Sequence, residues 1–514
     1  MRPTFMGFET AKSAIFVNQK SIDIVGTNLS NMNTNGYTRQ RVETATMYVN
    51  NTSSRVTSKR IGIMGQGVEA LGVGQVRDAY LDKRFRDEYS KNAYYREAND
   101  VLSDIQSVFD DGHDVSSLTG ITSAMEQIFK SIQDFAESPT VGTSANVVMS
   151  AFSNMVQVLN QLDNKLTNVQ QQQSYDMKNT TARVNELLEE LAHLNKAISR
   201  DESVVSNPDN EHYRPNELYD KRNMVLDELA AYGNIEVSEK ANGTVDVKMG
   251  GVMVVSGSDH NKLNFFQNQD GTVALSWAKG GQPAQFTSGS LKASMEYING
   301  RGTNIQSSNE TPQKGIPYYR DKIDTYANAL AQVVNNSIPE YDPETKQPKV
   351  DENGNIIYKT LLSAKGEDGK TNNTLPINAK NISISDEWRE GGADYFIYSK
   401  EVADPSFAQS IGIKLTQDAF TFKSHGESFT GTFEEFYTDF VSGLGSEISY
   451  VQGRQEASAI VTDDFLTRRD AVSGVSRDEE TANLVTFQKS YEAAARVMNV
   501  MDELLDVIIN QMGV

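Results

Sequence analysis

The sequence predicts an α+β multidomain protein, in which a coiled-coil-like layer of terminal helices and a long-helix bundle domain accompany inserted β-rich domains. Apolar residues recur at steps of three and four at both ends of the chain and through its middle, which is the spacing of one helix face. Residues 143–232 contain no glycine, which favours long helices. Two later segments instead alternate β-branched and polar residues between glycine and proline turns, as strands do.

The first helix should run from about residue 4 to residue 32. It should end at the Asn33-Thr34-Asn35-Gly36 turn, because Asn-Gly tolerates the left-handed conformation that ends helices. Residues 41–75 are rich in glycine and β-branched residues and are predicted to be strand and loop. The apolar positions of this helix, interrupted by Asn18, form what we call the N-terminal stripe: Phe8, Ala11, Ile15, Ile22, Val25, Leu29 and Met32.

The last hundred residues contain no proline and are predicted to be helical. Ser476 should cap the final helix, with the acidic run 478–480 in its first turn or on a solvated face. The apolar positions of the final helix form the C-terminal stripe: Leu484, Phe487, Tyr491, Ala494, Met498, Met501, Leu505, Ile508 and Met512. Because chain ends usually fray, we predict that both stripes are subunit interfaces that have no partner in the isolated monomer.

Helices are also predicted over about 78–109 and 118–135, in a bundle within 142–232, and over 319–333. Asn242-Gly243 predicts a β-hairpin. Residues 339–431 carry most of the remaining turn signals and are expected to fold as an independent, variable β-rich insertion. The predicted domains are a terminal polymerisation layer (1–45 with 470–514), a helical core domain (46–232 with 290–338 and 432–469), a β-rich domain (233–289) and the variable β-rich insertion (339–431).

Composition excludes several functions. Forty-eight basic and 69 acidic residues leave a formal charge of −21, whereas nucleic acids and anionic membranes bind basic surfaces. No apolar run approaches the roughly 18 residues that span a bilayer, and no cleavable secretory signal is expected. The chain has no cysteine, which excludes disulfides and thiolate metal sites.

Three apparent sites have simpler explanations. The run from Gly65 to Ala70 matches a dinucleotide-binding fingerprint, but Gly72 and Gly74 would disrupt the helix that the fingerprint needs, so a flexible strand is expected. Residues 351–355 imitate the start of a calcium loop but lack its later glycine and glutamate, which favours a hairpin turn. The five histidines are isolated from one another. We therefore predict no enzyme activity, no catalytic or metal site and no cofactor.

Both ends of the chain resemble a known family. Residues 27–37 resemble the N-L-x-N-x-x-T-x-G-Y signature of bacterial flagellar axial proteins, which are the rod, hook and hook-associated proteins. Residues 473–491 resemble the C-terminal signature of the same family. The residues that carry the N-terminal motif are Asn28, Leu29, Asn31, Thr34, Gly36, Tyr37, Arg39 and Gln40.

Three features resemble the hook-associated members in particular: Thr38-Arg39-Gln40, the long helical region 78–200, and the segment 216–226. The resemblance covers roughly residues 1–340 and 432–514. It implies a structural protein of the flagellum that forms the hook–filament junction at the distal end of the hook and is needed for filament assembly. It also implies secretion through the flagellar export apparatus to the extracellular flagellum.

The resemblance further implies the partners: the hook protein, a second junction protein, copies of the chain itself in a ring, and a cytoplasmic export chaperone at the C-terminal helix. Nucleic acid and membrane are not expected as partners. Two alternatives stay open. The chain could be a hook or distal-rod protein, or the insertion 339–431 could give it a surface-exposed adhesive or hydrolytic role.

Overall fold

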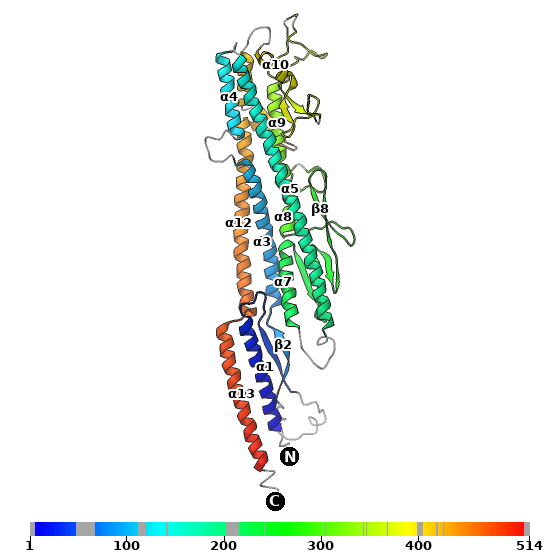
Figure 1. The fold of residues 1–514 in the computed structure, drawn as a ribbon, viewed down its shortest axis with the longest axis vertical. Helices are drawn as coiled ribbons and strands as arrows, with labels where there is room; N and C mark the ends of the chain where they lie inside the picture. The colour runs from blue at the N-terminus through cyan, green and yellow to red at the C-terminus, as the bar shows by residue number, and fades with distance from the viewer. Residues whose placement is uncertain are drawn as a thin grey trace.

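The structure is a computed structural model in which the chain forms a long rod (Figure 1). A body of lengthwise helices makes up most of the rod, and both ends of the chain lie together at one tip, where they form the terminal layer. The described residues are 6–47, 67–110, 120–139, 142–201, 215–240, 242–303, 305–342, 344–345, 347–366, 368–397, 405–417, 420–424 and 426–507.

Long helices run along the body because their sequences lack residues that would end them. The helix α5 (Gly142–Arg200) continues for 59 residues, so most of the region 142–232 that was predicted to be a bundle is a single helix. Asp78 caps the helix α3 (Ala79–Phe109) by accepting from the backbone N–H groups of the first turn. Beside them lie α4 (Ile121–Glu137), α7 (Asn216–Tyr232), α8 (Ser290–Ile298), α9 (Ile316–Asn335) and α12 (Phe433–Ser473).

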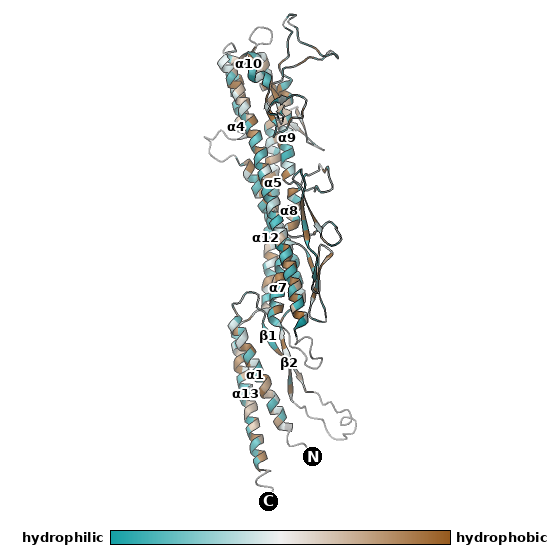
Figure 2. Ribbon diagram, turned by 45° about the vertical axis from the view of Figure 1, so that its right-hand side comes forward, coloured by the Kyte–Doolittle hydropathy of each residue, from teal (hydrophilic) through white to brown (hydrophobic). Residues whose placement is uncertain are grey.

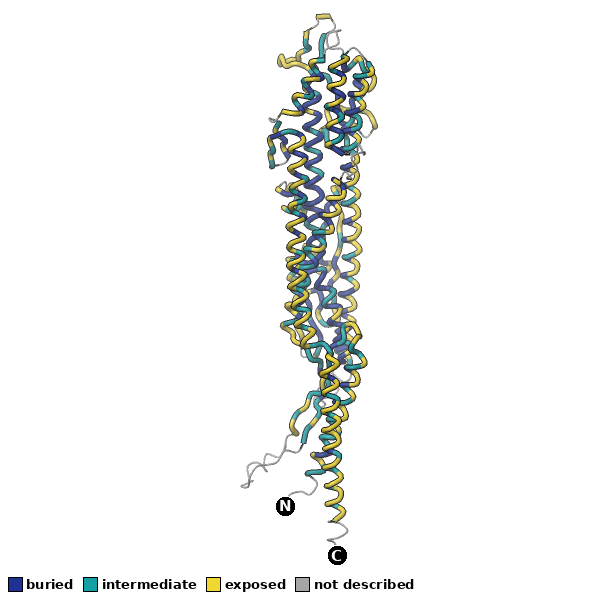
Figure 3. Tube along the Cα trace, turned by 90° about the vertical axis from the view of Figure 1, so that its left-hand side faces the viewer, coloured by how far each residue is buried: buried dark blue, intermediate teal, exposed yellow. Residues whose placement is uncertain are grey.

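Two hydrophobic cores follow one another along α5. The first joins its N-terminal half, as far as Leu166, to α3, α4, α9 and α12. The second begins at Met177 and joins the C-terminal half of α5 to α7 and the β strands. Figure 3 shows buried residues inside the body and mostly exposed ones along the last helix of the terminal layer. The body therefore carries most of the apolar burial.

The predicted β-rich segment 233–289 forms two antiparallel sheets on one side of the body (Figure 1). The Asn242-Gly243 hairpin is confirmed, since Ile235 to Glu239 pairs with Val245 to Met249 and Gly243 has a φ of 75°. The strands are β3 (Ile235–Glu239), β4 (Val245–Met249), β5 (Val252–Ser256) and β6 (Asp259–His260) in one sheet, and β7 (Leu263–Gln267) and β8 (Val273–Trp277) in the other.

Residues 339–431 do not form an independent β module, so that prediction is wrong. Trp388 is fully buried against Phe152 of α5, with ring centroids 5.9 Å apart, and Phe422 stacks on Phe436 of α12 at 4.3 Å. The large apolar residues of the segment complete the first core, because the helices alone leave it uncovered. The segment contains β9 (Leu362–Lys365), β10 (Thr371–Asn372), β11 (Ile382–Ile384), α10 (Asp386–Ile397), α11 (Ser406–Thr416), β12 (Phe420–Ser424) and β13 (Glu427–Gly431).

The terminal layer contains the two end helices and a β-hairpin (Figure 2). Strand β1 pairs antiparallel with β2, and both lie against α1, where Ser13 Oγ accepts from the backbone N–H of Val68 at 3.3 Å. The predicted boundary between the terminal layer and the helical core domain lies at residue 46. That boundary falls inside the hairpin, so β2 belongs with the terminal layer and not with the helical core domain. The elements are α1 (Met6–Asn31), β1 (Gln40–Thr46), β2 (Val68–Gln75) and α13 (Arg477–Asp506).

Candidate functional site: the joint between the two chain ends and the body

The N-terminal and C-terminal stripes pack against each other within one chain. The helices α1 and α13 lie side by side (Figures 1 and 2), with Ala11, Val25 and Ala494 buried between them. A Cβ at Gly7 would lie 2.6 Å from Met501 Cε, so the Met501 side chain packs directly against the backbone of α1 there. The stripes therefore have a partner in the monomer, contrary to expectation, because each supplies the apolar face that the other needs.

The other stripe residues are less completely covered. Most are half-buried, and Tyr491 remains 38% exposed. Ile508 and Met512 lie outside the described residues. The half-buried positions are Phe8, Ile15, Ile22, Leu29, Met32, Leu484, Phe487, Met498, Met501 and Leu505.

Asn28 joins three segments with one side chain. Its Nδ2 donates to the carbonyl of Gln40 at 2.9 Å and to Glu480 Oε2 at 3.0 Å. Its Oδ1 accepts from the Tyr37 hydroxyl at 2.8 Å and from the backbone N–H of Gln40 at 3.0 Å. Both donors and both acceptor sites of the amide are thus used, which only asparagine can do in this position. The side chain fixes α1 to the start of β1 and to α13.

Arg39 and Glu480 connect the N-terminal motif to the C-terminal helix. Arg39 Nε donates to Glu480 Oε1 at 2.8 Å, and Nη1 donates to Glu479 Oε2 at 2.9 Å. The backbone N–H of Arg39 also donates to the carbonyl of Ser473 at 2.8 Å, at the end of α12. Two residues from opposite ends of the sequence therefore form a buried, charge-assisted contact.

The acidic run 478–480 lies in the first turn of α13, as predicted. Ser476 caps α13, as predicted, by accepting from the backbone N–H of Glu479. Glu480, however, is only 1% exposed and is not on a solvated face. The carboxylate is stable there because Arg39 and Asn28 donate to it. Helical spacing could not reveal these donors, since they lie more than 400 residues away in the sequence.

The turn between α1 and β1 explains the rest of the motif. Gly36 has a φ of 78°, and a Cβ there would lie 2.2 Å from Met224 Sδ of α7, so the position requires glycine. Thr34 closes the turn through its backbone N–H, which donates to the carbonyl of Asn31 at 2.9 Å. Burial, together with the charges of Asp220 and Glu480, raises the pKa of Tyr37 to about 12. Its hydroxyl therefore remains a hydrogen-bond donor at neutral pH.

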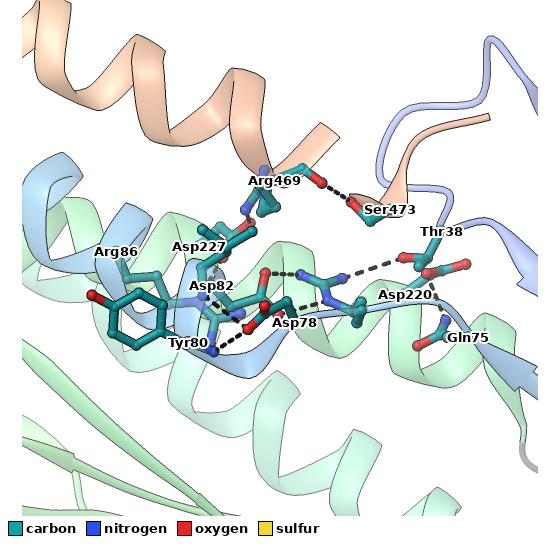
Figure 4. Close-up of polar contacts among 12 residues, drawn as sticks. Thr38, Gln75, Asp78, Tyr80, Asp82, Arg86, Asp220, Asp227, Arg469 and Ser473 are labelled. Atoms are coloured by element: carbon teal, nitrogen blue, oxygen red, sulfur yellow. Dashed lines mark hydrogen bonds and ion pairs between the residues drawn. The ribbon is translucent and has the colours of Figure 1, made fainter. Parts of the chain in front are cut away.

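A polar network attaches this turn to the body (Figure 4). Gln75 Nε2 donates to Asp220 Oδ1 at 2.8 Å, and Asn216 Nδ2 donates to the carbonyl of Val73 at 3.2 Å. Arg77 Nη1 donates to Thr38 Oγ1 at 3.3 Å. The segment 216–226, which resembles the hook-associated proteins, forms the first part of α7 and therefore holds the hairpin and the turn against the body.

Ion pairs extend the same network into α3 and α12 (Figure 4). Burial alone would raise the pKa of Asp82, but two hydrogen bonds from Arg77, at 2.8 and 2.7 Å, and the charges of Arg77, Arg86 and Arg469 together lower that pKa. Asp227 of α7 accepts from Arg86 at 2.7 Å and from Arg469 at 2.6 Å. We call the contacts from Asn28 to Arg469 the joint, because they connect the terminal layer with three body helices.

Sequence reasoning missed a second apolar stripe on α13. It consists of Ala493, Val497, Val500, Leu504 and Val507, again at steps of three and four, and all five residues are exposed. We call it the outer stripe. Across the layer, a groove of about 550 Å³ between α1 and the hairpin includes Phe16, which is 61% exposed. The three- and four-residue spacing of these apolar positions could have revealed the outer stripe from the sequence. It was overlooked because the C-terminal stripe on the same helix is longer.

The dinucleotide-like run 65–70 and the calcium-loop-like run 351–355 have the predicted strand and turn structure at the residues that the structure describes. Val68 to Ala70 lie in β2, while Gly65 and Gln66 fall outside the described residues. Asp351 accepts from the backbone N–H groups of Asn353 and Asn355 in a turn with Gly354 at a φ of 84°. Within the described residues, no group of three histidine or acidic side chains is placed to hold a metal, and no helix is long and apolar enough to cross a membrane.

The chain resembles known proteins along its whole length. Residues 102–338 match the model of the flagellar hook-associated protein FlgK helical domain. Residues 470–512 match that of the flagellar basal body rod FlgEFG protein C-terminal region. Flagellar hook-associated protein 1 of Bacillus subtilis is 28% identical, over 100% of this chain and 99% of that protein. The proteins of the same name from Salmonella typhimurium and Escherichia coli are 22% and 21% identical, each over 97% of this chain and 98% of theirs.

One solved structure, of the flagellar hook junction protein FlgK from Burkholderia pseudomallei, overlaps 55% of this chain and 46% of that one. Its sequence identity is 16% and its TM-score is 0.41, so it adds no support of its own. The helical-domain match, the C-terminal match and the full-length relatives agree with one another. The chain therefore combines a helical domain of the hook-associated protein FlgK type with the C-terminal region of flagellar rod proteins, and it is similar over nearly its whole length to three relatives named flagellar hook-associated protein 1.

Proposed function

We propose that this chain forms the hook–filament junction, as a structural subunit at the distal end of the hook that filament assembly requires. The observation that carries the proposal is the terminal layer. The helices of both chain ends lie side by side there at the tip of the rod, while the outer stripe of α13 remains uncovered. An exposed apolar stripe of this kind needs a partner.

The proposed self-association is a ring in which the terminal layers of neighbouring subunits touch. The outer stripe of one subunit would dock in the groove beside Phe16 of the next. Lys12 and Lys20 line that groove together with Glu9, Asp23 and Glu69, so the proposed docking depends on the apolar contact with Phe16 and not on charge. A head-to-tail interface of this type closes into a ring when its rotation permits.

The predicted interface residues keep a part in this proposal. Phe8 of the N-terminal stripe and Tyr491 of the C-terminal stripe retain exposed surface after the helices pair. These edges would extend the contact that the outer stripe begins. The better-buried members, such as Ala494, would act within the subunit by holding α13 in place.

The remaining partners follow from the family. The hook protein would lie on one side of the ring and a second junction protein on the other. A cytoplasmic chaperone would cover the C-terminal helix before export through the flagellar apparatus to the cell exterior. The outer stripe supports this, since it would otherwise be exposed in the cytoplasm.

Deletion of the gene tests the junction. Electron microscopy of the deletion strain should show complete hooks that lack filaments. Loss of the hooks themselves would contradict the proposal and point to a hook or distal-rod protein.

Complementation of that strain tests the interface. Val500→Asp places a carboxylate on the outer stripe, whose burial in a subunit contact would cost several kcal/mol, so filaments should be absent. Asn499→Asp adds the same charge on the polar face of α13 and should restore filaments. Filaments on the Val500→Asp strain would exclude the outer stripe as the contact.

A further inference from the structure

A second cleft lies at the base of the body, next to the joint. It has a volume of about 670 Å³ and lies between the start of α3, α7 and β3. Four basic side chains line it: Arg77, Lys83, Arg86 and Arg222. Arg77 is already paired, because both of its hydrogen bonds to Asp82 are short. Arg86 and Arg222 are less completely satisfied.

Arg86 is more than nine-tenths buried. Its Nε donates to Asp227 Oδ1 at 2.7 Å, but the other oxygen of Asp227 is taken by Arg469 at 2.6 Å. Nη2 of Arg86 is shielded from solvent and has no acceptor among the described residues. The Asp227 carboxylate thus accepts hydrogen bonds from two guanidinium groups, and the buried Nη2 of Arg86 is left without an acceptor among the described residues.

Arg222 is similarly buried. Its Nη1 donates to the carbonyl of Gly243 at 2.6 Å, whereas Nη2 lies 3.5 Å from an oxygen of the exposed Glu239. Nε of Arg222 has no acceptor in the described part of the chain. Burial lowers the pKa of Arg222, and the charge of Arg86 lowers it further, although Glu239 and Tyr219 oppose the change. The two guanidinium groups therefore repel each other in a poorly solvated place.

We propose that this cleft binds a small oxyanion, a carboxylate or a phosphate-like ion, that bridges the guanidinium groups of Arg86 and Arg222. Guanidinium groups present planar pairs of donors that match two oxygens of such an ion. Because Nη2 of Arg86 and Nε of Arg222 are closed to solvent, the two side chains would shift on binding so that the anion accepts these N–H groups and separates the two positive charges. Asp82, Glu236 and Glu239 also line the cleft, so a small ion fits better than an extended acidic chain.

Anion binding here would strengthen the joint. Gln75 and Arg77 line the same cleft, and they hold Asp220 and Thr38 of the joint. An ion that fixes α3 and α7 relative to each other therefore also fixes the attachment of the terminal layer. Because binding only to the folded state stabilises it, the ion would raise the unfolding temperature of the body.

Isothermal titration calorimetry of the full-length protein tests the site. Phosphate, sulfate and citrate are titrated at ionic strength matched with chloride, and at least one should bind saturably. Tight binding of citrate alone would identify a carboxylate, and binding of phosphate or sulfate an inorganic ion. Arg222→Gln should weaken binding about tenfold or more, since it removes a charge-assisted hydrogen bond. Arg183→Gln is the matched control: Arg183 pairs with Glu186 and Glu228 outside the cleft, so affinity should not change.

Absence of saturable binding by all three anions, or equal affinity in Arg222→Gln, would overturn the proposal. A second measurement uses only the unaltered chain, in case Arg222→Gln does not fold. Crystals soaked in selenate should show an anomalous peak between Arg86 and Arg222. Peaks only at other positions, or no peak, would refute the site.

Discussion

Glu480 is the residue that ties the two chain ends together. Its side chain is 2% exposed and accepts from Arg39 and Asn28. Glu480→Gln keeps the shape but removes the charge, and its amide would face the Asn28 donor. We expect this to destabilise the terminal layer by about 1.5–3 kcal/mol, the range for hydrogen bonds to charged groups. Amide hydrogen exchange in α1 and α13 should accelerate accordingly, while the body is unchanged.

Glu479→Gln is the control for that experiment. Glu479 contacts the same arginine, but its side chain is 63% exposed, and exposed ion pairs contribute little. Its exchange rates should match those of the unaltered protein. Equal acceleration in both variants would mean that burial of Glu480 is not what stabilises the joint.

The buried Asp324 of α9 should make the free energy of unfolding depend on pH. Burial raises its pKa to about 6, against a hydrogen bond from the backbone N–H of Ala379. A carboxyl whose folded-state pKa is raised is destabilising above that pKa, and the penalty disappears as pH falls through 6 towards the unfolded value. Asp324→Asn should therefore increase the free energy of unfolding at pH 8 by roughly 1–3 kcal/mol. At pH 4 it should have no such effect.

Chemical unfolding at the two pH values measures this difference. Asp134→Asn, at an exposed position of α4, serves as the comparison and should be neutral at both. A gain from Asp324→Asn that is the same at pH 4 and pH 8 would show that its ionisation is not the cause.

At the scale of elements, α13 presents two faces with different roles. Ala494 is buried against α1, whereas the adjacent Ala493 is exposed on the outer stripe. Ala494→Asp should open the pair of terminal helices in the monomer, because it buries a carboxylate without a partner. Ala493→Asp should leave the monomer as stable as before. Circular dichroism and hydrogen exchange of dilute protein distinguish the two; matched stabilities would mean that α1 and α13 do not pack in solution.

At the scale of the whole molecule, the segment 339–431 is part of the body. Trp388 is fully buried against Phe152 and Phe396. Trp388→Ala should cost about 3–5 kcal/mol, as large cavities do, and replacement of the whole segment by a linker should prevent the body from folding. Leu375→Ala, at a 40% exposed position, should be nearly neutral. A linker variant that unfolds with the original midpoint would show that the segment is an independent module after all.

Local patterns in the sequence determined the helices and the main hairpin. Helical spacing, the Ser476 cap and the Asn242-Gly243 turn act within a few residues, so each is visible without a structure. The motif residues 28–40 could also be identified from sequence, although not what they contact. The composition of residues 339–431 led to the wrong prediction of an independent module. A turn-rich sequence does not reveal that its few large apolar residues complete the first hydrophobic core of the body.

Only the tertiary structure decided which distant residues meet. It paired the two terminal stripes within one chain, buried Glu480 beside Arg39, and left Val497 and Val500 exposed. It also placed Arg86 and Arg222 in one cleft, although they lie on different helices. An apolar stripe specifies that a helix needs a partner but not which partner, since the same face can be covered from within the chain or from another subunit. The sequence therefore determined the parts of this protein, and long-range packing decided how its two ends form one joint.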